Sequence, residues 1–277
     1  LLPRILQDPR YRDFGITVQE HITQTDVASD VVSHAYIKQF ASMEDLGKIQ
    51  MTRLKGDRKR QDEAMEEGQR IFLGIAPLYW EGVSLHCGLW DTISQWQGVQ
   101  ECYFMLIDEP ELLHAMMERM TQAMLSLIRQ GNEEGLFDVA SGVCHCSHTI
   151  TQPFGTGMED RPGLASNSWA FGLAQLFSSV SPEVTAEFEI PYMKRIFQEF
   201  GDVYYGCCER LDDRLELVAE LPNVRKVSCS PWSDPERFAS QLPKRLIMSN
   251  KPNPALVASG NLQAMKEELE QVMAAAK

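Results

Sequence analysis

The sequence lacks long apolar runs, and this absence excludes several classes of protein. No stretch of uncharged apolar residues is long enough to cross a lipid bilayer. Residues 1–15 contain neither the apolar core nor the cleavage site of a secretory signal, and they do not begin with Met. We therefore expect a cytoplasmic protein without a membrane segment, and the chain reads as a piece of a longer protein.

Positive charge is also scarce. The 277 residues include 26 Lys and Arg against 39 Asp and Glu, which gives a formal net charge of −13. Such a chain repels nucleic acid and anionic lipid surfaces at long range. We therefore expect no nucleic-acid or membrane partner, and a small molecule is the expected substrate.

Short motifs that identify common cofactor sites are missing as well. No GxGxxG follows any predicted strand, so a dinucleotide-binding sheet is not indicated. No CxxC or HExxH is present, so the sequence has no strong zinc signature. The seven cysteines are an odd number in a chain without a secretory signal, which favours free thiols in a reducing compartment.

What the sequence does contain is a regular alternation of strand and helix patterns. Residues 70–80 form a continuous apolar run typical of a buried strand, and residues 108–137 have the spacing of a long amphipathic helix. Further strands are predicted at residues 14–24, 30–40, 138–149, 202–208, 224–232 and 245–250, and further helices at residues 181–201, 212–221, 234–242 and 261–276. This order predicts βαβ units and one (β/α)₈ barrel domain over residues 1–277.

Reactive side chains follow the predicted strands. Because the carboxyl ends of parallel strands share one rim, chemistry collects there. The residues at these ends are Trp80, Cys144, His145, Cys146, His148, Cys207, Cys208, Glu209, Cys229, Trp232, Asn250, Lys251 and Asn253.

Thiols and imidazoles in this set indicate a metal site, with zinc as the expected ion. Strand alternation places Cys144 and Cys146 on one face and directs His145 to the other. The alternative interpretation is that these cysteines are small buried apolar residues, as free cysteines often are.

The remaining candidates are polar or aromatic. Glu209 follows an apolar strand, where it is placed to act as a general acid or base, or to start the next helix. Lys251 is either an anion-binding group or an ordinary loop cation, and Asn253 lies beside it. Three tryptophans are expected to line an apolar substrate pocket or to pack in the core: Trp80, Trp90 and Trp232.

Three segments together resemble the uroporphyrinogen decarboxylase superfamily. They are SPEVTAEFEIPYMKRIFQEFG, DVYYGCCERLDDRLELVAELPNVRKVSCSPWSD and LIMSNKPNPALVA, and the resemblance is sharpest from Ser181 to Ala258. It implies a (β/α)₈ TIM barrel. It also implies that this chain is incomplete at its N-terminus and lacks a final βα unit.

The superfamily contains two chemistries. One branch holds metal-free decarboxylases of carboxylated tetrapyrroles. Another holds zinc methyltransferases, which move a methyl group from a corrinoid protein to a thiol. Their His-x-Cys-Gly motif aligns with Tyr205, Gly206, Cys207 and Cys208 here. Tyr205 replaces the His and Cys208 replaces the Gly, so the resemblance implies only Cys207 as a metal ligand.

The resemblance favours methyl transfer from a corrinoid or similar donor. The expected metal ligands are Cys207 and Cys146, and the expected catalytic residues are Glu209 and His145. The expected cofactor is zinc, and the expected partner is a corrinoid protein. The alternative is a carboxy-lyase that needs no cofactor.

Overall fold

The computed structural model describes residues 4–6, 14–24, 26, 32–51, 53–54, 57–76, 78–139, 142–149 and 162–276. For residues 4–6, Arg58, Tyr79 and Trp80 it describes only the backbone. None of the helices within these ranges is both long enough and apolar enough to cross a membrane.

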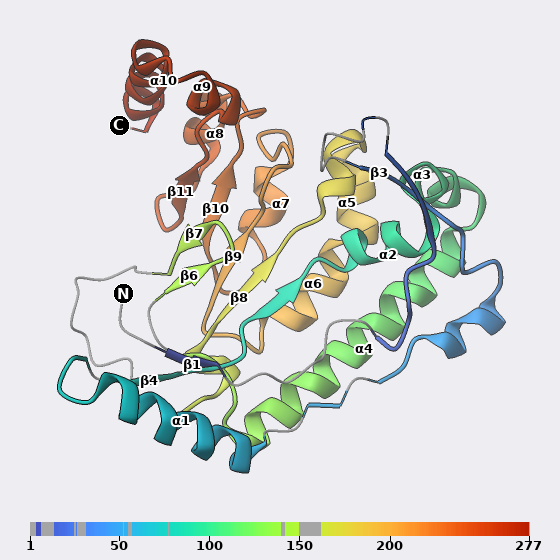
Figure 1. Cartoon of the computed structure of the whole chain (residues 1–277). Coiled ribbons are helices and arrows are strands. Elements are labelled where there is room, and N and C mark those ends of the chain that lie inside the picture. Colours follow the sequence, from blue (N-terminus) through green and yellow to red (C-terminus); the bar gives the residue numbers. More distant parts are fainter. Residues whose placement is uncertain are drawn as a thin grey trace.

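A five-stranded parallel sheet forms the centre of the molecule (Figure 1). Its strands are β5 (Leu85–Cys87), β8 (Trp169–Gly172), β9 (Asp202–Tyr205), β10 (Val224–Cys229) and β11 (Ile247–Asn250). They run in the order β11-β10-β9-β8-β5, with every neighbouring pair parallel. All five strands therefore end at one edge, but the sequence predicts only β9, β10 and β11 and misses β5 and β8.

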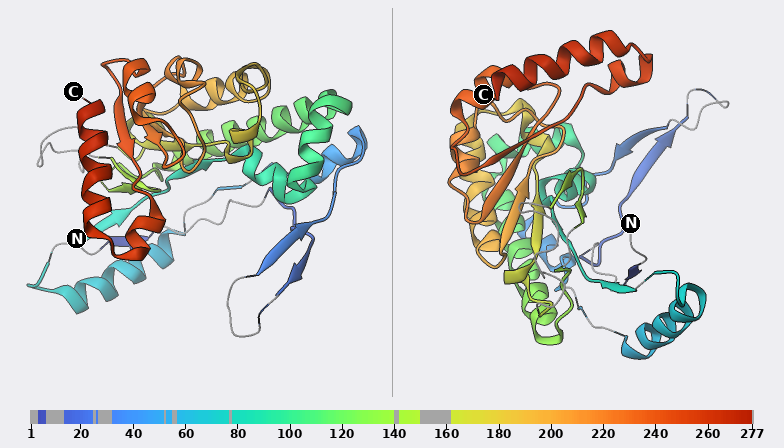
Figure 2. Two further views of the ribbon diagram at one scale, coloured as in Figure 1. Left: turned by 90° about the horizontal axis from the view of Figure 1, so that it is seen from above. Right: turned by 90° about the vertical axis from the view of Figure 1, so that its left-hand side faces the viewer.

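Helices cover one face of this sheet, as Figures 1 and 2 show. Between β5 and β8 the chain forms α2 (Leu89–Gln97), α3 (Val99–Asp108) and α4 (Pro110–Glu134), and between β8 and β9 it forms α5 (Pro182–Phe188) and α6 (Ile190–Phe197). Helix α7 (Leu215–Ala219) follows β9, α8 (Pro235–Gln241) follows β10, and α9 (Pro254–Ser259) and α10 (Leu262–Ala275) follow β11. The 3₁₀ helices are η1 (Met43–Lys48), η3 (Ala165–Asn167) and η4 (Gln175–Ser179).

The alternation predicted after Ser181 is therefore confirmed, with one break. The predicted helix 181–201 divides into α5 and α6 at Glu189, whose φ is −117°. Pro191 has no N–H to donate to the Glu187 carbonyl, as an unbroken helix would require, and it is tolerated in the first turn of α6. Ser181 caps α5 by accepting a hydrogen bond from the Val184 N–H.

The core lies between the sheet and the helices. Met116, Met117, Met120 and Met124 of α4 are buried there, as the helical spacing predicts. Trp90 is completely buried between Phe177 and Phe188, and its indole N–H donates to the Phe188 carbonyl at 3.0 Å. This helix-covered face thus contains the apolar interior of the molecule.

The predicted buried strand at residues 70–80 is wrong. Helix α1 (Arg58–Phe72) continues through its first residues, and only β4 (Tyr79–Glu81) is extended, paired with β1 (Arg4–Leu6). Leu73 is 84% exposed and Ile75 is 77% exposed, so these two side chains are not buried as the prediction requires. The apolar residues of this run lack the two neighbouring strands that a buried strand needs.

The predicted parallel strand at residues 138–149 is also wrong. Residues 143–148 form an antiparallel hairpin of β6 (Val143–Cys144) and β7 (Ser147–His148). His145 has a φ of +55°, the left-handed conformation that tight hairpin turns use. Cys144 and Cys146 therefore do not share a strand face, because Cys146 lies in the turn.

Another two-stranded hairpin joins β2 (Glu20–Thr23) to β3 (Ser33–Tyr36), near the strands predicted in residues 14–40. It extends away from the sheet in Figure 2. The fold is thus mixed α/β around a parallel sheet, and β5 and β11 are the edges of that sheet within the described residues.

Replacement of Trp90 by Phe should destabilise the fold. The Phe188 carbonyl would lose its buried donor, which costs about 1–3 kcal/mol. Chemical denaturation monitored by circular dichroism measures this change. Trp232→Phe is the matched control, because Trp232 is 67% exposed, and it should change stability by less than about 0.5 kcal/mol. Equal effects of the two variants would contradict the placement of Trp90 in the core.

Candidate metal centre

The end of strand β9 places Cys207 at the sheet edge. The Gly206 N–H donates to the Gly172 carbonyl of β8 at 2.7 Å, which extends the strand pairing by one residue. Gly206 then turns with a φ of +91°, and a Cβ there would lie 2.5 Å from Leu211 Cδ1. Only glycine fits this turn without strain. Cys207 follows it and is buried.

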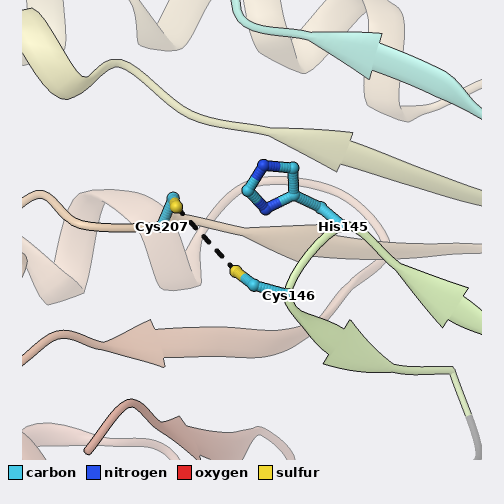
Figure 3. A group of neighbouring side chains, drawn as sticks. All are labelled: His145, Cys146 and Cys207. Carbon is cyan, nitrogen blue, oxygen red and sulfur yellow. Dashed lines mark hydrogen bonds between the residues drawn. The ribbon is translucent and has the colours of Figure 1, made fainter. Parts of the chain in front are cut away.

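The β6–β7 hairpin brings two further ligand atoms to Cys207 (Figure 3). The hairpin lies on the face of the sheet opposite the helices, as Figure 2 shows. The His145 ring stacks on Phe171 of β8, with ring centroids 4.3 Å apart. Cys146 Sγ lies 3.8 Å from Cys207 Sγ and 3.3 Å from the Tyr204 hydroxyl. Segments about 60 residues apart in the chain thus meet at one point.

These three residues form a group that could hold a metal ion. One nitrogen of His145 and the sulfur atoms of Cys146 and Cys207 all lie within 4.8 Å of one another. Zn–S bonds of about 2.3 Å at tetrahedral angles put two zinc-bound sulfur atoms about 3.8 Å apart. The Sγ–Sγ distance of 3.8 Å has this value. Three protein ligands also leave one tetrahedral position for a substrate.

Burial controls the protonation of these groups. It raises the pKa of the Cys207 thiol above its ordinary value, and the neighbouring Cys208 and Cys146 thiols add to this rise. Burial also lowers the pKa of His145, assisted by the positive charge of Lys251. His145 is therefore a neutral imidazole at neutral pH, the form that binds metals. The Cys207 thiol ionises at neutral pH only when a cation lies beside it.

Glu209 is placed differently from an exposed catalytic acid. Only 3% of the residue is exposed, and both carboxylate oxygens accept backbone hydrogen bonds. Oε2 accepts from the Cys207 N–H at 2.7 Å, and Oε1 from the Ala174 N–H at 3.3 Å. These contacts fix the turn that carries Cys207. The geometry therefore favours a positioning role for Glu209, and its catalytic role stays a prediction.

The predicted substrate-binding residues do not gather around Cys207 as a set. Lys251 does reach the hairpin, where its ammonium donates to the Cys146 carbonyl at 2.8 Å. Trp90 packs in the core on the helix-covered face. Asn253 caps α9 by accepting from the Ala255 N–H at 2.9 Å. Trp232 is exposed in the loop after β10, and the Trp80 side chain lies outside the described residues.

Sequence reasoning missed two side chains beside the cluster. Tyr204, whose hydroxyl contacts Cys146, was hidden among the apolar residues of a predicted strand. His86 of β5 lies with its ring centroid 5.9 Å from that of His145 and 5.0 Å from that of Phe171. The available sequence signal for His86 was the apolar–polar–apolar alternation of Leu85-His86-Cys87. In the structure His86 is exposed, and Leu85 and Cys87 are buried.

A group of buried carboxyls lies beneath this edge of the sheet. Glu189 has no exposed surface, and only its Oε1 has a partner, the Tyr205 hydroxyl at 3.3 Å, among the residues that the structure describes. Burial raises the pKa of Glu189 well above its ordinary value, and the nearby Asp91 and Glu209 raise it further. Burial likewise raises the pKa of Glu209.

One comparison with known proteins finds a similar fold. The structure is similar to a methyltransferase from Methanosarcina mazei, with a TM-score of 0.51 and 11% sequence identity. The match covers 93% of this chain and 67% of the other chain. At this identity the likeness concerns the fold alone. No protein-family model matches the sequence, and no curated protein matches it.

Glu189→Gln should remove part of the pH dependence of stability. The raised pKa means that the folded protein holds a proton above about pH 4.3, where the unfolded chain has lost it. The wild-type unfolding free energy therefore falls as pH rises from about 4.3 through the folded-state pKa, by about 1.4 kcal/mol for each unit of raised pKa. The Glu189→Gln variant should be more stable than the wild type at pH 8, and the difference should shrink at pH 5. Urea denaturation at both pH values measures this.

The matched control for this prediction is Glu220→Gln, because Glu220 is exposed at the end of α7. It should leave the pH profile of stability unchanged. A Glu189→Gln variant that loses stability equally at pH 5 and pH 8 would contradict the protonated state of Glu189.

Glu209→Gln should destabilise the protein by about 1–3 kcal/mol. The amide NH₂ of glutamine would face either the Cys207 N–H or the Ala174 N–H, so one buried donor would lose its acceptor. Denaturation measures the loss. A variant with full stability but no enzymatic activity would instead establish direct catalysis by Glu209.

Proposed function

We propose that this chain is a zinc-dependent methyltransferase of the uroporphyrinogen decarboxylase superfamily. It would transfer a methyl group from a corrinoid or similar donor to a thiol. The resemblance of residues 181–258 supports the superfamily, and the fold shared with a methyltransferase supports this branch. The domain over residues 1–277 would be part of a (β/α)₈ barrel.

The observation that carries the proposal is the convergence of His145, Cys146 and Cys207. The superfamily's own motif has a histidine where this chain has Tyr205, so the sequence lacks the usual ligand set. The β6–β7 hairpin, from another part of the chain, places the His145 imidazole and the Cys146 thiol beside the Cys207 sulfur. Two sulfur ligands and one nitrogen ligand suit zinc.

The chain's own residues would act in three ways. His145, Cys146 and Cys207 would hold the ion, and Glu209 would fix the Cys207 backbone through the Cys207 N–H. A bound zinc ion supplies Lewis acidity that lowers the pKa of a substrate thiol. The aromatic side chains of Phe171 and Tyr204, stacked 5.3 Å apart, would keep the sheet side of the site apolar.

The proposed methyl transfer needs no added oxidant or reductant. The substrate thiol first gives its proton to solvent. The electron pair of its sulfur then forms the new bond to the methyl carbon. The bond between this carbon and its donor breaks, and that electron pair leaves with the donor. A donor bound to a separate corrinoid protein would have to reach the sheet edge that carries Cys207.

Purified protein should contain about one zinc per chain, and Cys207→Ser and Cys146→Ser should each lose it. Each variant removes one member of the His145, Cys146 and Cys207 group, which weakens binding by at least about tenfold. Elemental analysis after dialysis against a weak chelator measures the content. Methyl transfer from methylcobalamin to a small thiol should fall in parallel.

Cys208→Ser is the matched control, because Cys208 Sγ lies 3.5 Å from Cys207 Sγ but Cys208 is exposed and outside the group of three. It should keep its zinc. Equal zinc loss from the Cys208 and Cys207 variants would contradict the proposed ligand set. A metal-free protein that decarboxylates a carboxylated substrate would overturn the proposal in favour of the lyase alternative.

A further inference from the structure

The β6–β7 hairpin is attached to the sheet by side chains that have no place in the reaction proposed above. Lys251 follows β11 and donates from its ammonium to the Cys146 carbonyl at 2.8 Å and to the Ser249 hydroxyl at 3.1 Å. The same ammonium lies 5.0 Å from the centre of the Tyr204 ring. Ser249 of β11 contacts the Ser147 hydroxyl at 2.9 Å.

A second lysine holds the other end of the hairpin. Lys226 lies within strand β10 and is only 7% exposed. Its ammonium donates to the His148 carbonyl and lies 5.8 Å from the centre of the Trp169 ring. Burying an ammonium is costly unless acceptors surround it. The buried ammonium of Lys226 is therefore stabilised by its bond to the His148 carbonyl, and in return it fixes the hairpin there.

The hairpin needs such attachments. Each of its strands has two residues, and an isolated two-stranded hairpin of this size is marginally stable in water. The left-handed conformation of His145 adds backbone strain at the turn. The ligand positions of His145 and Cys146 therefore depend on what fixes the hairpin to the sheet.

We propose that Lys226 and Lys251, with Ser249 between them, are positioning residues that lock the β6–β7 hairpin and so preorganise the His145 and Cys146 ligands. This inference rests on the proposed metal function. It assigns Lys251 to the carbonyl of Cys146 in the hairpin turn and Lys226 to the carbonyl of His148 at the end of β7. The sequence left Lys251 as either an anion-binding group or an ordinary loop cation, and the role proposed here acts through Cys146.

The geometry separates this role from substrate binding. Two acceptors already occupy the Lys251 ammonium, and Lys226 is buried beneath the hairpin. Loss of a substrate-binding cation would raise the KM for substrate and leave the metal affinity unchanged. Loss of a positioning cation weakens metal binding in the absence of any substrate.

The first experiment measures zinc affinity by competition with a chromophoric chelator. Lys251→Met and Lys226→Met should each bind zinc about 10- to 100-fold more weakly, as loss of groups that orient metal ligands does. Lys251→Arg should recover part of the affinity, because its guanidinium still donates to the Cys146 carbonyl. Lys244→Met is the control, since Lys244 lies in the loop before β11, and it should bind zinc like the wild type.

The second experiment needs no metal. Amide hydrogen exchange in the metal-free protein reports how firmly the hairpin is held, and the Thr149 N–H, bonded to the Gly142 carbonyl, is the reporter. Its exchange should accelerate in Lys251→Met and Lys226→Met and stay unchanged in Lys244→Met. Ser249→Ala is a milder variant for the case that a lysine variant does not fold, and it should accelerate exchange less.

The results distinguish the two proposals. Faster exchange in the lysine variants of a protein that binds no zinc would refute the metal function and retain the hairpin lock. Zinc binding by the wild type, with unchanged affinity and exchange in both lysine variants, would refute the lock and retain the metal function.

Discussion

The pairing of β9 with β8 and β10 is the constraint on which the rest of the structure depends. Parallel pairing on both sides fixes the strand from Asp202 to Tyr205, and the bond from Gly206 to Gly172 carries it to the sheet edge. The left-handed turn at Gly206 then releases Cys207 from the sheet. Because the neighbouring strands end at the same edge, Cys146 of the hairpin meets this thiol there, and Tyr204 and Lys251 in turn contact Cys146.

The two faces of the sheet serve different purposes. The helix-covered face buries methionines, Trp90 and other large apolar side chains, and it supplies the stabilising burial of the fold. The opposite face carries polar groups that contact the hairpin, among them Lys226, Ser249 and Lys251. One layer of backbone thus separates the main apolar core from the thiols, although the hairpin face also buries a smaller apolar cluster that includes Trp169, Phe171 and Tyr204.

Electrostatics explains why the same edge combines thiols with lysines. Burial raises the pKa of Cys207 and of Glu189, which favours the neutral form of both groups in the folded protein. The two lysine ammoniums instead donate to backbone carbonyls of the hairpin, which solvate their charge. A cation placed among His145, Cys146 and Cys207 would reverse the balance at the thiols and stabilise their ionised form.

The sequence by itself determined the strand–helix alternation after Ser181, with the shared edge of β9, β10 and β11 and the position of Cys207, because periodicity and turn residues are local signals. It did not show β5 and β8, which are too short to give a periodic signal. It did not determine the hairpin at residues 143–148, since a left-handed His145 has no distinctive sequence signal, and alternation therefore separated His145 from Cys146. It also misplaced residues 70–80, where apolar composition alone cannot show whether neighbouring strands exist. Only the tertiary structure decided that Cys146 meets Cys207 and that Lys226 and Lys251 hold the hairpin, because contacts between segments so far apart depend on how the whole chain packs.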